Sequence, residues 1–308
     1  MIVADSENTW KIAGRLTEAG APRSMAARKQ NSGASLAVAY DQTPHLALVD
    51  YSPSQGLTVR RRLDLPERPR RVFAADYNSD GILDWLVLGD SLGTLTIFAG
   101  QNNGEFQEGQ TITLGSDTLD VQIGDLENRG QMQLAALSRA SAQISIYSIL
   151  QNGLLFPRSS LSVDKGTNAL TLGRLDSDPY PDAAVINPEK NNATLFFSNG
   201  KSGLNVSQTL SLAGKPTSIL AYDMDGDGRD DLVITLEGGN FVLIDLNKDL
   251  QNPFRFDTVL RPQAAAVGDA NGDGLPDFAV IGSEEANVTV YLSRGPVAVQ
   301  KWRWHESK

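Results

Sequence analysis

Five segments of the chain carry acidic side chains at a spacing that suits one hard cation. Positions one, three, five and nine of each segment are mostly Asp or Asn, and position six is usually Gly. Alternate side chains of a tight loop can turn toward one centre, and glycine permits the sharp turn because it tolerates positive φ. Three segments keep the whole set. Their expected ligands are Asp76, Asn78, Asp80, Ile82 and Asp84; Asp223, Asp225, Asp227, Arg229 and Asp231; and Asp269, Asn271, Asp273, Leu275 and Asp277.

The expected ligand atoms are all oxygens. Position seven would offer its backbone carbonyl, and the Asp at position nine would close the shell from the start of the next strand. Oxygen ligands with several negative charges favour Ca²⁺ over Zn²⁺ or copper. We therefore expect about three Ca²⁺ ions with a structural role, because each complete segment would use the acids at its ligand positions on the ion.

Plain hairpin turns and EF-hand loops both fit these Asp- and Gly-rich segments less well. Ordinary hairpin turns need only one or two such residues, and three crowded carboxylates without a cation would repel one another. An EF-hand loop has Glu at position twelve between two helices. In the three complete segments position twelve is occupied by Val87, Ile234 and Val280.

The remaining segments are degenerate. Arg174 replaces the first acid of one, and Arg129 replaces the fifth-position acid of another. A guanidinium could neutralise the remaining carboxylates in place of a metal, or these sites could simply have decayed. We expect weak or no metal binding there. The corresponding loop at Ala27 to Ser35 has no acid and should bind none.

The acidic segments recur at a fixed period. They begin at residues 76, 125, 174, 223 and 269, which gives steps of 49, 49, 49 and 46. A short alternating strand follows each start in the same register. The strands are expected at 94–98, 143–147, 192–196, 241–245 and 287–291, and an earlier one at 45–49 indicates a sixth repeat.

Each repeat has room for four strands, which is the length of one propeller blade. The inner strands are nearly all apolar and the outer ones mixed, as in a blade buried between its neighbours. The sequence thus predicts an all-β protein, a β-propeller of four-stranded antiparallel blades, with six recognisable repeats and six or seven blades. We expect one domain over 1–308, in which 1–21 supplies a ring-closing strand. The repeats lie near 22–69, 70–118, 119–167, 168–216, 217–261 and 262–308.

The three complete segments resemble the FG-GAP or VCBS repeat, which is found in the propeller of integrin α-subunits and in many secreted bacterial proteins. The resemblance covers the chain from about residue 22. It implies typically seven blades, with Ca²⁺ in the hairpin between the first two strands of a blade. It also implies adhesion, carbohydrate binding or a scaffold role, outside the cell or at its surface. This chain departs from the family in having six recognisable repeats and three intact loops.

Composition argues against most enzyme classes. The chain has no Cys and only two His residues, His45 and His305. No nucleophile elbow, zinc-protease motif or phosphate loop is present. The leading hypothesis is a non-catalytic binding module for a protein or glycan, and the alternative is a carbohydrate-active enzyme of polysaccharide-lyase type or its propeller part. A net charge of −10 argues against nucleic acid as a partner. No apolar run is long enough for membrane insertion, and we expect a monomer.

Two surface features could contact a ligand. The basic run Arg60–Arg62, with Arg68, Arg70 and Arg71, could meet an anionic glycan or could be a solvated outer strand. Trp302 and Trp304 lie on one face of a terminal strand, where they could stack on a sugar or pack against a neighbouring blade. Trp85 occupies a repeat position that is apolar elsewhere, so we expect it in the core.

Overall fold

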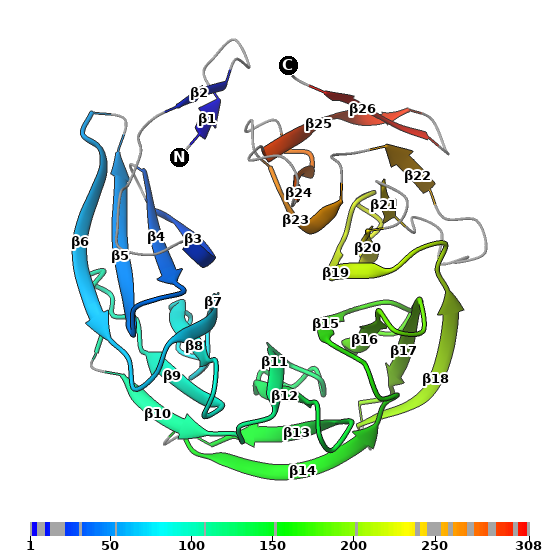
Figure 1. The fold of residues 1–308 in the computed structure, drawn as a ribbon, viewed down its shortest axis with the longest axis horizontal. Helices are drawn as coiled ribbons and strands as arrows, with labels where there is room; N and C mark the ends of the chain where they lie inside the picture. The colour runs from blue at the N-terminus through cyan, green and yellow to red at the C-terminus, as the bar shows by residue number, and fades with distance from the viewer. Residues whose placement is uncertain are drawn as a thin grey trace. The chain divides into compact units, whose positions relative to one another are not determined.

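The computed structural model describes most of the chain. The described residues are 2–4, 10–12, 22–30, 33–52, 54–107, 109–150, 153–200, 203–237, 241–244, 254–257, 261–269, 274–282, 288–297 and 301–306. Their regular elements are all β-strands (Figure 1). No helix in this described part of the chain is long and apolar enough to cross a membrane. The predicted all-β class is confirmed.

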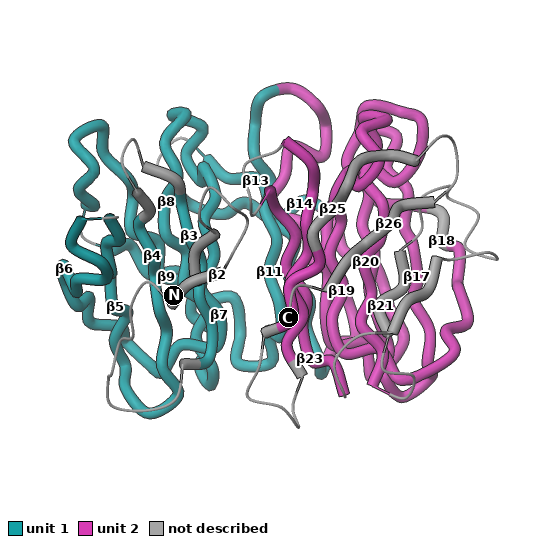
Figure 2. Tube along the Cα trace, turned by 90° about the horizontal axis from the view of Figure 1, so that it is seen from above, with its two compact units in different colours: residues 1–123, 130–140, 147–158 teal, residues 124–129, 141–146, 159–308 magenta. Residues whose placement is uncertain are grey.

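Four-stranded sheets dominate the fold, and each is built from four consecutive strands. By contact the chain divides into two compact units, coloured in Figure 2: residues 1–123, 130–140 and 147–158, and residues 124–129, 141–146 and 159–308. The first unit holds two whole four-stranded sheets. They are β3 (Pro22–Gln30), β4 (Gly33–Tyr40), β5 (His45–Ser52) and β6 (Gly56–Asp64); and β7 (Pro69–Ala75), β8 (Asp84–Gly89), β9 (Thr94–Phe98) and β10 (Gln110–Thr113).

The second unit holds three whole four-stranded sheets. They are β15 (Ala169–Gly173), β16 (Asp182–Asn187), β17 (Asn192–Ser198) and β18 (Leu204–Ser211); β19 (Pro216–Tyr222), β20 (Asp231–Leu236), β21 (Phe241–Ile244) and β22 (Phe254–Asp257); and β23 (Pro262–Gly268), β24 (Asp277–Gly282), β25 (Val288–Val297) and β26 (Lys301–Glu306). A further four-stranded sheet has residues in both units. It consists of β11 (Thr118–Gly124), β12 (Gln133–Ser138), β13 (Gln143–Ile149) and β14 (Leu155–Ser162).

Burial decreases from the second strand of a sheet to the fourth. Every residue of β8, β16 and β20 is buried, whereas most of β10 and β14 is exposed. Continuous apolar runs such as Trp85 to Leu88 form these second strands because both of their faces are covered. Trp85 is 0% exposed and packs in a core cluster with Phe98 and Phe106, as predicted.

Strand register places the acidic segments. In four hairpins the residue just before position one pairs with position nine across the first two strands, and the segment between them becomes the connecting loop. These pairs are Ala75 with Asp84, Gly173 with Asp182, Tyr222 with Asp231, and Gly268 with Asp277. The second strands therefore begin at positions 84, 182, 231 and 277, in step with the sequence repeat.

One expectation needs correction. Ala27 to Ser35 is no open loop, because the backbones of β3 and β4 stay paired as far as Gln30 and Gly33. The strand order of the described residues gives six four-stranded sheets. Closure into six or seven blades stays a prediction.

At the N-terminus, β1 (Ile2–Ala4) pairs with β2 (Trp10–Ile12) in a two-stranded sheet. The fourth strand of the last sheet is β26. The ring-closing role of residues 1–21 stays a prediction.

Candidate metal centre

The loop between β7 and β8 shows how an acidic segment folds. Both carboxylate oxygens of Asp76 accept backbone amides, Oδ1 from Asp80 at 3.0 Å and Oδ2 from Gly81 at 2.9 Å. Asn78 Oδ1 accepts the amide of Asp80, and Asp80 Oδ1 accepts the amide of Ile82. Gly81 has a φ of 81°, which side chains rarely adopt. Positions one, three and five are thus turned inward by hydrogen bonds to the loop's own backbone.

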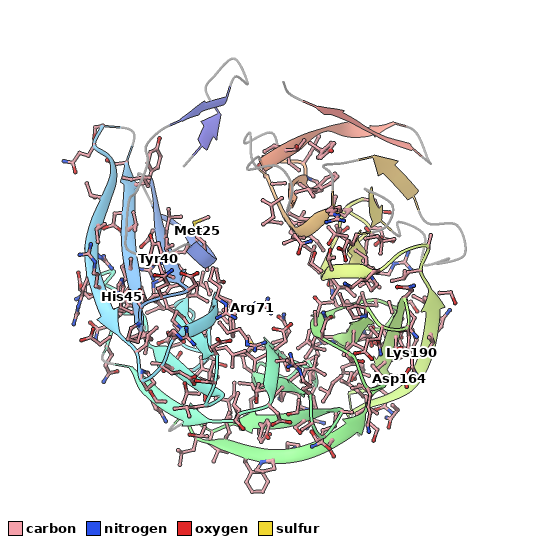
Figure 3. All side chains as sticks on the ribbon, viewed as in Figure 1. Met25, Tyr40, His45, Arg71, Asp164 and Lys190 are labelled. Atoms are coloured by element: carbon pink, nitrogen blue, oxygen red, sulfur yellow. The ribbon has the colours of Figure 1, made fainter. Side chains whose placement is uncertain are left out.

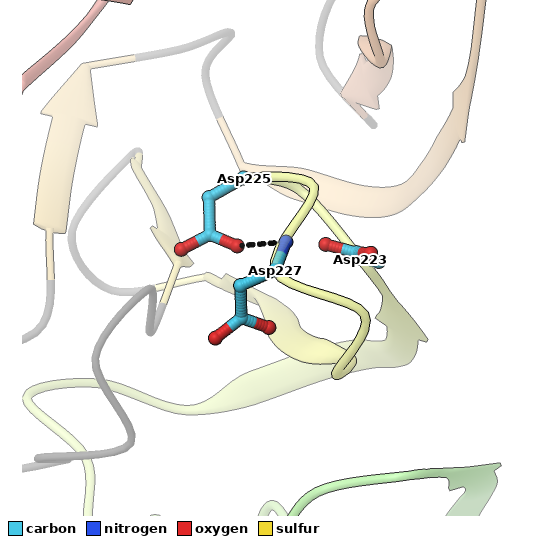
Figure 4. A group of neighbouring side chains, drawn as sticks. All are labelled: Asp223, Asp225 and Asp227. Carbon is cyan, nitrogen blue, oxygen red and sulfur yellow. Dashed lines mark hydrogen bonds between the residues drawn. The ribbon is translucent and has the colours of Figure 1, made fainter.

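The loop between β19 and β20 brings three carboxylates together (Figure 4). Asp223, Asp225 and Asp227 each offer an oxygen, and these oxygens lie within 4.8 Å of one another. Asp223 Oδ2 accepts the amide of Gly228 at 2.9 Å, and Asp225 Oδ1 accepts the amide of Asp227 at 3.0 Å. The hydrogen bonds repeat those of the Asp76 loop, so the shared sequence pattern produces a shared geometry.

Electrostatics of this cluster favour a cation. Burial raises the pKa of Asp225, and the charges of Asp227 and Asp223 raise it further. A divalent cation at the centre would relieve this repulsion, and three carboxylates match the ligand preference of a hard ion such as Ca²⁺. The donor set therefore fits one such cation.

Arg229 contributes more than its backbone carbonyl. Its Nε donates to Asp227 Oδ2 at 2.8 Å, and its Nη2 donates to the same oxygen. This hydrogen bond raises the pKa of Arg229. The guanidinium thus occupies an oxygen of Asp227 that a cation could otherwise bind, a feature that the sequence pattern did not reveal.

The acid at position nine is a buried clamp. Asp84 is 1% exposed, and its two oxygens accept the amides of Tyr77 at 2.8 Å and Gly100 at 2.7 Å. Asp182, which is 0% exposed, accepts from Leu175 and Ser198 at 2.9 and 2.8 Å in the same way. Each carboxylate thereby ties the start of the loop to the end of the third strand.

The sequence pattern predicts position nine as a metal ligand and does not reveal this clamp. The available signal was its place at the first residue of an apolar strand, where an unpaired carboxylate would be costly. Asp231 is also buried, and its Oδ2 accepts the amide of Met224 at 3.0 Å. Burial raises the pKa of Asp84 and raises that of Asp182 to about 6.

The loop between β23 and β24 keeps two of these features. Asp269 Oδ2 accepts the amide of Gly274 at 2.9 Å, and Asp277 is 0% exposed. Leu275 follows the glycine at position seven. Asn271 and Asp273, the two other ligands expected here, lie outside the described residues.

The degenerate loops keep part of the geometry. Asp176 Oδ1 accepts the amide of Asp178 at 2.8 Å, and Asp178 Oδ1 accepts that of Tyr180 at 2.9 Å. Arg174 stands in place of the first acid, and Pro179 stands at position six, where the other acidic segments have Gly. Arg129 Nη1 lies 3.4 Å from Glu127 Oε2. Whether this arginine replaces a metal or marks a decayed site stays open.

Much of the basic run is already paired within the first unit. Arg60 Nε lies 3.7 Å from Asp50 Oδ2, and Arg70 Nη2 lies 3.4 Å from Asp90 Oδ1. Arg71, labelled in Figure 3, forms an ion pair with Asp120. These contacts reduce the charge available to an anionic glycan. The side-chain placement expected for Trp302 and Trp304 falls outside the described part of the structure.

Comparison with a family model finds the FG-GAP-like repeat at residues 76–136 and 174–234. Each match contains two of the acidic loops. Comparison with curated protein sequences gave no significant match.

Solved structures share the fold over nearly the whole chain. A protein from Lactobacillus plantarum matches with a TM-score of 0.67 and 13% identity, over 97% of this chain and 88% of that one. The periplasmic gluconolactonase of Pseudomonas aeruginosa matches with a TM-score of 0.69 and 15% identity, over 98% and 89%. BBS1N, solved in complex with ARL6DN, matches with a TM-score of 0.59 and 13% identity, over 92% and 84%.

The fold defined by the sheets and by these similarities is an all-β propeller of small four-stranded antiparallel sheets. Within it the chain carries FG-GAP-like repeats, and one of their loops holds an acidic cluster that could bind a metal.

Proposed function

We propose that the three complete loops each bind one Ca²⁺ and that the ions are structural. The observation that carries the proposal is the convergence of Asp223, Asp225 and Asp227 within 4.8 Å. The same carboxylate-to-amide bond from position one to position six in the loops at Asp76 and Asp269 supports extending it. Each loop joins the first two strands of a sheet, where an ordered turn stabilises their register.

The number of ions can be counted directly. Anomalous scattering from crystals soaked in a lanthanide that substitutes for calcium should give three strong peaks, one at each complete loop. Five equal peaks would contradict the interpretation of Arg129 and Arg174 as replacements for ligands. The absence of a peak at Asp223 to Asp231 would contradict the proposal itself.

For the molecule as a whole we propose a non-catalytic binding, adhesion or scaffold module of six or seven blades. It would act on a protein or glycan at the cell surface or outside the cell, as a monomer. The FG-GAP-like repeats support this function. The loop carboxylates support it as well. They accept hydrogen bonds from the backbone amides of their own loops and would also bind the ion, which leaves them unavailable for catalysis.

A lactone- or carbohydrate-active enzyme is the second candidate. It is favoured by the similarity in fold to the Pseudomonas aeruginosa gluconolactonase, although 15% identity carries the fold alone. A glycan array combined with a lactone-hydrolysis assay separates the two. Binding to a glycan without turnover of glycan or lactone supports the module, whereas hydrolysis that exceeds a heat-denatured control supports the enzyme.

A further inference from the structure

Two neighbouring acidic loops of the second unit are joined by a reciprocal pair of hydrogen bonds. The amide of Arg174 donates to Asp230 Oδ2 at 2.8 Å, and the amide of Asp230 donates to the carbonyl of Arg174 at 2.8 Å. Arg174 begins the loop that follows β15, and Asp230 is position eight of the loop that follows β19. The two strands, β15 and β19, lie in contact.

The approach of Asp230 depends on a glycine. A Cβ at Gly173 would lie 2.9 Å from Asp230 Oδ2 and 2.5 Å from the Cβ of Ala221. The second distance is shorter than real Cβ contacts allow, so a side chain at Gly173 would push the two strands apart. The close contact of the two loops thus depends on the glycine at 173 and on the hydrogen bonds between Arg174 and Asp230.

The Arg174 loop lacks the bond that closes the complete loops. In those loops the carboxylate at position one accepts the amide at position six, as in Asp223 with Gly228. Here position one is Arg174 and position six is Pro179, so both partners of that bond are missing. Asp230 supplies a carboxylate from the neighbouring sheet to the same end of the loop.

Asp230 also lies between a residue of the proposed cation shell and a buried clamp. Arg229 would bind the cation through its carbonyl, and Asp231 is buried and accepts the amide of Met224. A cation that holds Arg229, together with the clamp at Asp231, would fix the peptide groups on either side of Asp230. The position of its amide and of its carboxylate would then be set before it meets Arg174.

We propose that Asp230 couples cation binding in the 223–231 loop to the order of the 174–182 loop. The inference rests on the proposed Ca²⁺ site and adds a consequence to it. One ion in the 223–231 loop would stabilise that loop and also the 174–182 loop, which has Arg174 in place of an acid at position one. Because coupling between two sites is reciprocal, the docked Arg174 backbone also favours binding of the cation.

Hydrogen exchange followed by mass spectrometry on the whole chain tests the coupling. Calcium added to chelator-treated protein should slow exchange in peptides covering 223–231 and in peptides covering 172–178. In Asp230→Ala the first effect should persist, and the second should fall by about two- to tenfold, the worth of the one hydrogen bond that the variant removes. The calcium midpoint for protection of 223–231 should rise by a similar factor.

Three further variants keep the result interpretable. Asp230→Asn retains an acceptor oxygen and should preserve most of the coupling if Asp230→Ala folds poorly. Asp178→Ala removes an acid of the 174–182 loop itself and should leave the calcium effect on 172–178 in place. Asp164→Ala breaks an exposed ion pair with Lys190, 2.8 Å long and labelled in Figure 3, and serves as the surface control in the same unit.

The outcomes separate the coupling from the site on which it rests. Calcium protection of 223–231 without any effect on 172–178 would overturn the coupling alone. The coupling would also be overturned if calcium protected 172–178 equally in wild type and in Asp230→Ala. Loss of this protection in Asp178→Ala would overturn it too. If neither peptide responds to calcium, the proposed site fails and the coupling fails with it.

Discussion

At the level of single residues, the acids of one loop have two different physical roles. Those at positions one, three and five face a common centre, whereas position nine is buried and accepts backbone amides. Asp225 and Asp227 belong to the first kind, and Asp84 and Asp182 to the second. One sequence motif therefore supplies both the acids that we propose to bind a cation and a buried strand clamp.

The clamp predicts a specific pH dependence at Asp182. Its pKa is raised from 3.8 to about 6 by burial, so the folded state binds the proton more tightly than the unfolded state does. Its contribution to the free energy of unfolding is thus fully present below pH 3.8 and is lost as pH rises through 6. The loss should amount to about 3 kcal/mol.

Asp182→Asn should remove that dependence. Urea unfolding of both proteins in chelator at pH 4 to 7 measures it, and the stability of the variant relative to wild type should increase with pH. The slope of stability against pH is the quantity to compare. Its absolute value is less informative, because Asn replaces one oxygen that accepts a backbone amide and so destabilises the variant at every pH. Parallel pH curves for the two proteins would show that Asp182 does not titrate in this range.

Arg229 predicts an increase in calcium affinity on mutation. Its guanidinium binds a candidate ligand oxygen of Asp227 and places a positive charge beside the cation centre. Arg229→Gln should therefore strengthen calcium binding by about two- to fivefold, the range of an exposed ion pair. Titration with terbium luminescence measures the change. An unchanged or weaker affinity would mean that the guanidinium does not compete with the cation.

At the level of elements, turns between strands are stabilised by buried carboxylates outside the acidic loops as well. Glu67, which is 8% exposed, precedes β7 and accepts five hydrogen bonds from the β8–β9 turn, donated by Ser91, Leu92 and Thr94. A Cβ at Gly89 would lie 2.0 Å from its Oε1, so the glycine makes room for the carboxylate.

This turn predicts the opposite pH dependence to Asp182. Burial raises the pKa of Glu67, but the hydrogen bonds from Leu92, Ser91 and Thr94 outweigh it and lower the pKa from 4.5 to about 2. The stabilisation is present above pH 4.5 and is lost as pH falls through 2. Glu67→Gln should lower the free energy of unfolding at pH 7 by about 3 kcal/mol and less at pH 3. Urea unfolding at both pH values checks this. Equal losses in the free energy of unfolding at pH 7 and pH 3 would contradict the prediction.

Strand positions could largely be predicted from the sequence, because two independent features share one period. The strands expected at 94–98 and 192–196 begin where β9 and β17 begin. At Ala27 to Ser35 the repeat register predicts a loop, whereas the backbones of β3 and β4 stay paired as far as Gln30 and Gly33. Contacts between distant segments, such as Arg174 with Asp230, leave no periodic trace in a single sequence.

For the molecule as a whole, calcium sites in the three complete loops would distribute stabilisation over several sheets. A site that binds only the folded chain contributes about 2.7 kcal/mol at a calcium concentration 100 times its dissociation constant. Three independent sites could contribute up to about 8 kcal/mol, comparable with the total stability of an ordinary domain. Cation binding would then be a condition for a stable fold.

Thermal unfolding with and without calcium, with the metal content measured in parallel, tests the central claim most directly. Chelation should lower the melting temperature markedly, and added calcium should restore it. In Asp227→Ala the shift between the two states should be smaller than in wild type, because one of three sites is removed. A metal-free protein that melts at the same temperature as the calcium-loaded one would contradict a structural role for the ion.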